Sequence, residues 1–526
     1  MFEERVSGIL LHPSSLPGPH GSGDLGPSAY HFVDWLLVAG QKLWQWLPTV
    51  HSGELQAQYS PYMALTAFGG SPLLVALEPL VDRGWLRSTG EPGFGAGRIA
   101  FPVVDAWRTA RLREAWSGFE AGATGEDRSA FLAWTKENAS WLDDYALFMS
   151  CQGAHAGKPW WEWPQGLASR GAEALGRARA EYSEEMRFWR FVQWCFDWQC
   201  LALKTYAEER GIEIVGDLPL FVARNSVDLW VAPELFVLDD AGRPTWEAGV
   251  PPDPIAPDGQ KWGLPLYRWD KMAEDGFGWW IRRVRRTLRY CNRFRIDHFR
   301  GLAAYWEIPA DARMASEGRW ARGPGRAFVD AITAAVDGAP IIAEDLAFIV
   351  TEDVHALRRQ YGIPGMKVLL YAFGGDARNE YLPHNFAPDC VAYTGTHDND
   401  TARGAWDSAS WRDRRFMAAY LGTDGSDVHW CMIRSLAASV ARTVIFPFQD
   451  VLGLGSEHRM NVAGTVSGAN WSWRFEWSMV GPDPARMLAE ITSSSGRCAF
   501  EKLGVGSPFA PPGPPAVDDP WKAYPF

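Results

Sequence analysis

The stretch RFRIDHFRG, which runs from Arg293 to Gly301, places charged side chains where the pattern otherwise indicates a buried strand. Arg295, Asp297 and His298 stand among apolar residues within it. A carboxylate at the end of a buried strand costs free energy unless it is paired with a cation or used in chemistry. The fold must therefore account for a strand that ends in such a group.

Seven other strand-like runs share the same form, a short apolar segment that ends in Gly, Pro or a polar cluster. Helical patterns separate most of these runs, as in residues 27–40, where Pro27 marks the start and Gly40 the stop. Eight strands alternating with helices favour an α/β fold of the (β/α)8 TIM type, although periodicity alone leaves a doubly wound sheet possible. The eight runs are Ser7–His12, Lys42–Pro48, Ile212–Pro219, Arg293–Asp297, Ile341–Asp345, Met366–Phe373, Val391–Asp398 and Thr443–Phe448.

The chain of 526 residues is too long for one simple core, which indicates several domains or one large barrel with insertions. We interpret residues 1–526 as a single catalytic barrel unit with inserted, largely helical subdomains around the active-site face. Residues of about 76–203 form a mostly helical insertion, and about 218–275 form an active-site loop subdomain. Residues 508–526 form a Pro-rich tail.

Composition and charge exclude several classes of function. The formal net charge is −12, and no Lys/Arg cluster follows the spacing of phosphates, which argues against nucleic acid as a partner. No signal peptide precedes the first strand and no apolar run is long enough to span a membrane. The seven cysteines have irregular spacing and no CxxC pair, as expected of reduced thiols in a cytoplasmic protein.

Four of the predicted strands end in an acid, namely Asp217, Asp297, Glu344 and Asp398. In a (β/α)8 barrel the carboxyl ends of the strands meet at one face, where active sites are built. A single acid at such a position often caps the next helix instead. Several together, with basic residues next to Asp297 and Asp398, favour function. Those neighbours are Arg295, His298 and His397.

Several carboxylates without a metal-ligand cluster indicate cleavage of glycosidic bonds. A retaining mechanism needs one carboxylate as the nucleophile and one carboxylic acid as the proton donor, ~5 Å apart. Arg295 precedes Asp297 by two residues, which places both on the same face of a strand and favours an ionised nucleophile. Glu344 as the donor needs a raised pKa. The 29 tryptophans fit either a large core or the stacking of sugar rings on indoles.

Two motifs point elsewhere and are rejected. GSGDLG (residues 21–26) matches a dinucleotide-binding pattern, but the acid expected at the end of the second strand is absent. The histidines show neither HExxH nor a two-His-one-carboxylate spacing, and the acids of THDND suit sugar hydroxyls better than a metal. We therefore expect no cofactor and no metal.

The sequence resembles the amylomaltases, also called disproportionating enzymes or 4-alpha-glucanotransferases. The likeness extends from Ser7 to about Arg474, nearly the whole chain. It is carried by SGILLHPSSLPGPHGSGDLG, LWQWLP, SPYMALTAFGGSP, IVGDLPLFVARNSVDLW, GVPPDPIAPDGQKWGLPLYRW, FRIDHFRG, IIAEDL, YTGTHDNDT, FPFQDVLGLGSEHRMN and NWSWR.

The resemblance implies a (β/α)8 barrel, a role for each acid, and alpha-1,4-glucans and malto-oligosaccharides as substrates, with glucose as an acceptor. By this likeness Asp297 is the nucleophile, Glu344 the general acid/base and Asp398 the transition-state stabiliser. Residues 250–264 form a mobile loop over the site. Contacts to the sugar at the cleavage point come from Arg295, His298 and His397, and the glucan groove is lined by Asp217, Tyr62, Gln260, Trp262 and Asn461.

Two departures from the family pattern stand outside the three acids. Ala347 follows IIAEDL where the family has Gly, and Val462–Gly464 replaces the usual x-Pro-Gly. Two other functions compete with transfer: an alpha-glucan hydrolase on the same barrel, and a non-catalytic glucan-binding protein. The long loop blocks argue against the first, and the three acids argue against the second.

Overall fold

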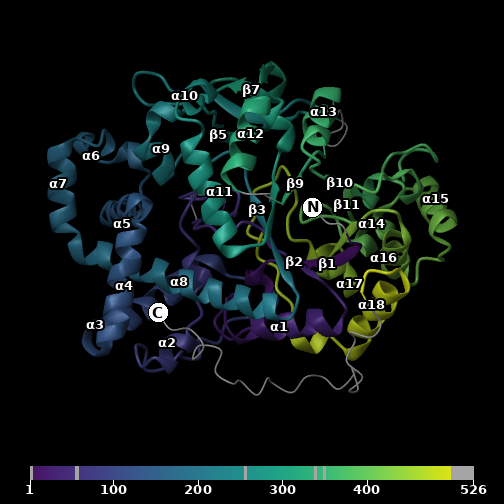
Figure 1. The fold of residues 1–526 in the computed structure, drawn as a ribbon, viewed down its shortest axis with the longest axis horizontal. Helices are drawn as coiled ribbons and strands as arrows, with labels where there is room; N and C mark the ends of the chain where they lie inside the picture. The colour runs from purple at the N-terminus through teal and green to yellow at the C-terminus, as the bar shows by residue number, and fades with distance from the viewer. Residues whose placement is uncertain (1–3, 54–57, 254–256, 337–339, 347–350, 499–526) are drawn as a thin grey trace.

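The computed structural model describes residues 4–53, 58–253, 257–336, 340–346 and 351–498 (Figure 1). The Pro-rich tail and the departure at Ala347 lie outside these residues, as does part of the 250–264 loop.

Eight parallel strands close into a barrel in the order β1-β12-β11-β10-β9-β6-β3-β2. Each strand falls within one of the eight runs predicted from the sequence or begins at most one residue before it. The (β/α)8 fold is therefore confirmed, and the open sheet is excluded. The strands are β1 Val6–Leu10, β2 Leu43–Gln45, β3 Glu213–Leu218, β6 Arg293–Ile296, β9 Ile341–Ala343, β10 Gly365–Val368, β11 Cys390–Tyr393 and β12 Thr443–Pro447.

The barrel closes where β1 lies between β2 and β12. Gly8 of β1 pairs with Leu43 of β2, and a Cβ on Gly8 would lie 2.4 Å from the Leu43 Cβ. Only glycine therefore permits the two strands to approach this closely. β2 is short and buried along its whole length, as is usual for parallel strands covered by helices.

Helices cover the outside of the barrel. The first, α1, spans Pro27–Val38; it begins at a proline, and Gly40 follows its end with φ of 69°, as the sequence predicted. The remaining covering helices are α11 Gly278–Tyr290, α12 Gly325–Ala335, α13 Glu352–Gln360, α14 Ala402–Ser408, α15 Trp411–Leu421, α16 Val428–Ala438, α17 Phe448–Val451 and α18 Pro482–Ser494.

The chain between β2 and β3 is mainly helical, and its helices α3 to α7 gather to one side of the barrel in Figure 1. The longest helix, α8, joins this group to the barrel, because it contacts α5 on one side and β3 on the other. The division of the chain into inserted units stays a prediction. The helices here are α2 Glu78–Asp82, α3 Phe101–Gly122, α4 Gly125–Glu137, α5 Ala139–Ala154, α6 Gln165–Ala168, α7 Ala172–Glu181 and α8 Ser183–Glu209.

A second sheet, antiparallel and four-stranded, has the order β5-β4-β7-β8. The sequence predicted only a loop subdomain over about residues 218–275. It predicted none of these four strands, two of which lie beyond that range. They are short and half-exposed, and β4 is irregular at Ala248/Gly249, so the alternation that marks a strand is weak. The elements are α9 Val227–Val231, β4 Trp246–Val250, β5 Gln260–Pro265, α10 Trp269–Glu274, β7 Ala304–Pro309 and β8 Arg319–Arg322.

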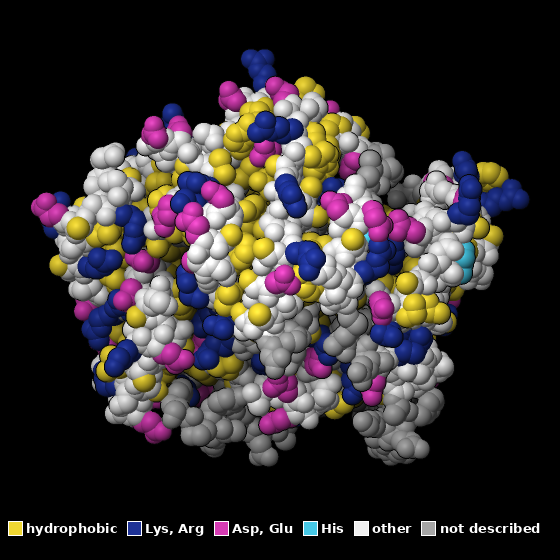
Figure 2. All heavy atoms as spheres, turned by 45° about the horizontal axis from the view of Figure 1, so that its top comes forward, with side chains coloured by type: hydrophobic (Ala, Val, Ile, Leu, Met, Phe, Trp, Pro, Cys, Tyr) yellow, Lys and Arg dark blue, Asp and Glu magenta, His cyan; other side chains and the backbone are white. Residues whose placement is uncertain are grey.

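The face shown in Figure 2 carries Lys and Arg side chains interspersed with Asp and Glu. No large area of one sign is visible on this face. Within the described residues, no helix combines the length and the apolar character that crossing a bilayer requires.

Candidate active site

Three of the four predicted strand-end acids lie at the carboxyl ends of barrel strands, and the fourth, Asp398, lies in the loop after β11. Asp217 is within β3, Asp297 follows β6 and Glu344 follows β9. The amide of Asp297 donates to the carbonyl of Leu218 at 3.0 Å, and the amide of Glu344 donates to that of Ile296 at 3.1 Å. These bonds continue the parallel ladder beyond the strand ends and hold the acids of neighbouring strands side by side.

Arg295 joins two of the acids. Its Nη1 donates to both carboxylate oxygens of Asp217 at 2.8 Å, and its Nη2 donates to Oδ1 of Asp297 at 2.7 Å. The Tyr62 hydroxyl donates to Asp217 from the other side, at 2.6 Å. Arg295 is 4% exposed, so these charge-assisted bonds form in a weakly screened environment. The contact between Arg295 and Asp297 predicted from the period-2 rule is confirmed.

Glu344 lies in surroundings that favour its protonated form. Its Oε2 accepts from the His298 amide and its Oε1 from the Leu346 amide, both at 2.8 Å. Burial raises the pKa of Glu344 to about 7, against the lowering effect of the Arg295 charge. The raised pKa expected of a proton donor is therefore present. His298 adopts a left-handed backbone (φ 54°), which turns its amide toward Glu344.

Asp398, in the loop after β11, has the opposite character. Its carboxylate faces Nε2 of His397 at 3.3 Å and accepts from Nδ2 of Asn461 at 2.6 Å. Burial alone would raise its pKa, but the His397 charge and these hydrogen bonds hold the pKa of Asp398 well below its usual range. Burial lowers the pKa of His397, yet the Asp398 charge prevails and raises it. Asp398 is consequently ionised.

Aromatic rings border the acids on two sides. Tyr62 stacks on His397 with ring centres 5.2 Å apart and an interplanar angle of 15°. Trp262 of β5 meets His298 edge-on at 5.0 Å, and its Nε1 donates to Oε1 of Gln260 at 3.1 Å. The missed antiparallel sheet therefore brings two predicted residues to the rim. Direct contacts connect all eleven of the predicted site residues in two groups, one around Arg295 and one around Glu344.

Three further residues at the rim were not singled out from the sequence. The Tyr371 hydroxyl accepts from Nδ2 of Asn399 at 3.0 Å. Trp471, with φ of 64°, tilts over Tyr62 at 5.5 Å between ring centres. Arg459 donates from Nη2 to the backbone carbonyl of Asp398 at 3.0 Å. Arg459 and Trp471 lie within the quoted blocks SEHRMN and NWSWR, which was the available signal, whereas Tyr371 lies within the predicted strand Met366–Phe373 and belongs to no quoted block.

One group of potential metal ligands occurs in the described parts of the chain, formed by His20, Asp24 and Glu78. It includes none of the strand-end acids. The guanidinium of Arg108 already donates to Asp24 at 2.9 Å, which opposes the binding of a second cation.

A (β/α)8 barrel whose rim combines a proton-holding carboxyl, two further carboxylates and aromatic borders defines an enzyme that acts on glycosidic bonds by carboxylate chemistry. The comparison with known families is more specific. Residues 11–479 match the model of glycoside hydrolase family 77, described as 4-alpha-glucanotransferase. The chain belongs to this family.

Individual relatives agree along nearly the whole chain. A 4-alpha-glucanotransferase of Thermus thermophilus is 46% identical over 93% of this chain and 99% of its own length. That of Synechocystis is 40% identical over 94% and 99%. Among solved structures, the amylomaltase from Streptococcus agalactiae in complex with acarbose has a TM-score of 0.89 and 33% identity, and the match covers 94% of this chain and 100% of that one.

Proposed function

We propose that the protein is a retaining 4-alpha-glucanotransferase, which moves a segment of an alpha-1,4-glucan to the 4-hydroxyl of glucose or of another glucan. The observation that carries the proposal is the pair of opposed carboxyl environments at one rim, with Glu344 inclined to hold a proton and Asp398 ionised. Membership of the 4-alpha-glucanotransferase family supports the same activity.

In the first half of the cycle, a carboxylate oxygen of Asp297 attacks the anomeric carbon while Glu344 gives its proton to the departing glycosidic oxygen. The bond from Arg295 to Oδ1 of Asp297 orients the nucleophile and stabilises its charge. Asp398 stabilises the positive charge that develops on the sugar ring. The products are a covalent glucosyl-enzyme and a shortened glucan.

In the second half, Glu344 is ionised and takes the proton of an acceptor 4-hydroxyl, whose oxygen attacks the anomeric carbon and displaces Asp297. Two inversions leave the alpha configuration unchanged. Glu344 leaves the cycle protonated again, which its raised pKa favours near neutral pH.

The remaining predicted residues serve the substrate in this proposal. Their mutual contacts place them around the acids, and the solved relative in complex with acarbose supports glucan binding at the rim. Arg295, His298 and His397 contact the sugar at the cleavage point, and the groove is lined by Asp217, Tyr62, Gln260, Trp262 and Asn461.

Transfer and hydrolysis differ only in the acceptor. Water is present at ~55 M, so transfer requires a sugar held in attacking position, where the effective molarity is far higher. Trp262 belongs to the strand that ends the 250–264 segment and contacts His298 beside Glu344. We assign it the role of holding the acceptor sugar against the intermediate.

The test is incubation of the purified protein with maltotriose alone, followed by chromatography and a reducing-end assay. Glucose together with maltotetraose and longer chains, at a constant number of reducing ends, is the expected result. Rising reducing ends with only glucose and maltose would show hydrolysis instead. Binding without any product would show a glucan-binding protein. Asp297→Asn in parallel assigns the activity to the proposed nucleophile.

A cytoplasmic location completes the proposal. The irregular spacing of the seven cysteines supports it, whereas the potato relative, 40% identical, is described as chloroplastic/amyloplastic. Fractionation of the source cells, with the maltotriose assay applied to each fraction, tests it.

A further inference from the structure

Asp398 lies in a loop rather than at the end of a strand, which sets it apart from the other acids. β11 ends at Tyr393, and the next helix, α14, begins at Ala402. The parallel ladder that fixes Asp297 and Glu344 does not extend to Asp398. Its position depends on contacts between this loop, residues 394–401, and the segment 456–461 that follows β12 and α17.

Asn461 makes one set of these contacts. Its backbone amide donates to the carbonyl of His397 at 3.1 Å, and its side-chain Nδ2 donates to Oδ1 of Asp398 at 2.6 Å. The orientation of the Asp398 carboxylate therefore depends on where the backbone of Asn461 lies relative to the 394–401 loop.

Arg459 fixes that relation. Its Nη2 donates to the carbonyl of Asp398 at 3.0 Å, and its Nε donates to the carbonyl of Asn461 at 3.2 Å. One rigid, planar guanidinium thus bridges the backbones of the acid and of the residue that orients the acid. A single ammonium group cannot reproduce both bonds with the same geometry.

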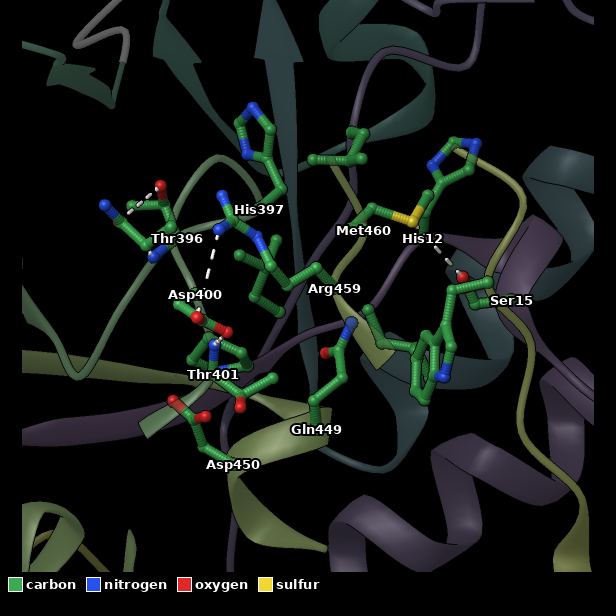
Figure 3. A pocket seen from close by; sticks show the side chains of 16 residues that line it. His12, Ser15, Thr396, His397, Asp400, Thr401, Gln449, Asp450, Arg459 and Met460 are labelled. Atoms are coloured by element: carbon green, nitrogen blue, oxygen red, sulfur yellow. Dashed lines mark hydrogen bonds and ion pairs between the residues drawn. The ribbon is translucent and has the colours of Figure 1, made fainter. Parts of the chain in front are cut away.

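Asp400 completes the link between the two segments. In Figure 3 Arg459 lies between His397 and Asp400, and its Nη1 is 3.9 Å from Oδ2 of Asp400. That oxygen also accepts from the Ser456 hydroxyl at 2.8 Å. Ser456 and Arg459 lie at opposite ends of one short 3-10 turn, so the acid binds the 456–461 segment at two points.

A small cavity of about 20 Å³, enough for about one water, lies beside His397 and Arg459 (Figure 3). Its lining combines polar residues such as His12 and Gln449 with apolar residues such as Met460 and Trp473. The polar bonds of Arg459 therefore act beside apolar packing at this place.

We propose that Arg459 is a positioning residue for the transfer reaction: by bridging the carbonyls of Asp398 and Asn461 it sets the orientation of the Asp398 carboxylate. The inference rests on the proposed function and assigns a role to a residue outside the sugar-contacting set. A misoriented Asp398 loses stabilisation chiefly in the transition state, so kcat changes while KM does not.

The first experiment compares Arg459→Gln and Arg459→Lys with the matched control Arg403→Gln. Arg403 lies on α14, pairs with Asp407 and donates to the carbonyl of Gly425, so its removal makes the same charge change without loss of a bond to Asp398 or Asn461. Arg459→Gln is expected to lower kcat with maltotriose roughly tenfold, the effect of losing a hydrogen bond from a charged donor, at unchanged KM. Arg459→Lys is expected to retain part of the rate. Rates equal to those of Arg403→Gln overturn the proposal.

The second experiment separates positioning of Asp398 from a general structural role. Arg459→Gln is combined with Asp398→Asn and assayed with an alpha-maltosyl fluoride donor, which needs no protonation of the leaving group. If Arg459 acts through Asp398, its substitution has little further effect in the Asp398→Asn background. The same fold-loss in both backgrounds overturns the proposal. Arg459→Lys replaces Arg459→Gln in this cycle if the glutamine variant does not fold.

A crystal structure of the same variant gives a readout that does not depend on activity. Displacement of the Asp398 carboxylate from Asn461 is expected, and an unchanged 2.6 Å contact overturns the inference. Failure of the wild-type protein to disproportionate maltotriose, by contrast, overturns the proposed function and leaves this structural result separately readable.

Discussion

Glu344 and Asp398 are carboxyl groups at the same rim of one barrel, yet their surroundings drive their pKa values apart. Both are subject to burial, which favours the neutral acid. Glu344 accepts from two backbone amides and lies near the opposed charges of Arg295 and Asp297, whereas Asp398 faces His397 and accepts from the side-chain amide of Asn461. The difference shows that the charge and hydrogen-bond partners decide whether burial prevails in setting the pKa of each carboxyl group.

The largest effect is expected from Glu344→Gln, because an amide cannot release the proton that the leaving oxygen needs. With maltotriose the rate should fall by ~10²–10⁴, the usual contribution of a general acid. With alpha-maltosyl fluoride the burst of released fluoride should persist, since fluoride leaves without protonation. Initial rates with both donors measure the contrast.

The control for this experiment is Glu352→Gln on α13, whose side chain is 75% exposed and pairs with Arg359. It should keep wild-type rates with both donors. An equal loss for maltotriose and for the fluoride burst in Glu344→Gln would remove Glu344 from the role of acid.

Arg295→Lys should come next in magnitude, because a lysine cannot bridge Asp217 and Asp297 at once. Breaking a buried pair costs about 3–5 kcal/mol, which corresponds to a loss of at least ~100-fold if it falls on the transition state. The rate with maltotriose measures the part of the loss that falls on activity, and denaturant unfolding measures the part that falls on the free energy of unfolding. The control is Arg319, whose side chain is 68% exposed and pairs with Glu307, and Arg319→Lys should change neither measurement appreciably.

Asn461→Ala should make the Asp398 environment more like that of Glu344. It removes the 2.6 Å bond to the carboxylate, so the pKa of Asp398 rises toward its ordinary value. The rate should fall roughly tenfold, as for one hydrogen bond to a charged group. The acidic limb of the pH–rate profile should move to higher pH. An unmoved acidic limb would contradict the assigned partner role of Asn461.

The barrel half of the molecule could be predicted from the sequence because its strands are continuous buried runs. β12, for example, is buried along all of its residues, and its apolar letters admit few alternatives. β8, in contrast, has mostly exposed residues, and the sheet that contains it was missed. Trp262 lies on β5 of this antiparallel sheet. Because the sheet was not predicted, Trp262 was assigned to the site only through the family resemblance.

The site shows the same division. Asp297 and its Arg295 partner are two residues apart on one strand, so period-2 geometry predicted their contact. The partners of Asp398 come from residues as distant as Asn461, which no local pattern brings together. The different pKa values of Glu344 and Asp398 depend on such long-range contacts, so residue spacing along the chain could not predict them.

The smallest effect, and the most direct measure of the contrast, is the pH dependence of stability. The pKa of Glu344 is raised from 4.5 to about 7 on folding, so the stability it contributes is present below the unfolded pKa and is lost as the pH rises toward 7. Glu344→Gln lacks this titration, and its stability relative to wild type should increase from pH 5 to pH 8 by at most about 3 kcal/mol. Asp398→Asn should show the opposite sign, because a pKa lowered from 3.8 stabilises the folded state above that value; its deficit should begin to shrink only as the pH falls below about 4. Denaturant unfolding of Glu344→Gln at pH 5 and pH 8, and of Asp398→Asn at pH 5 and pH 3, measures the pair. A deficit of Asp398→Asn that grows toward pH 3 would show that burial alone governs both carboxyl groups.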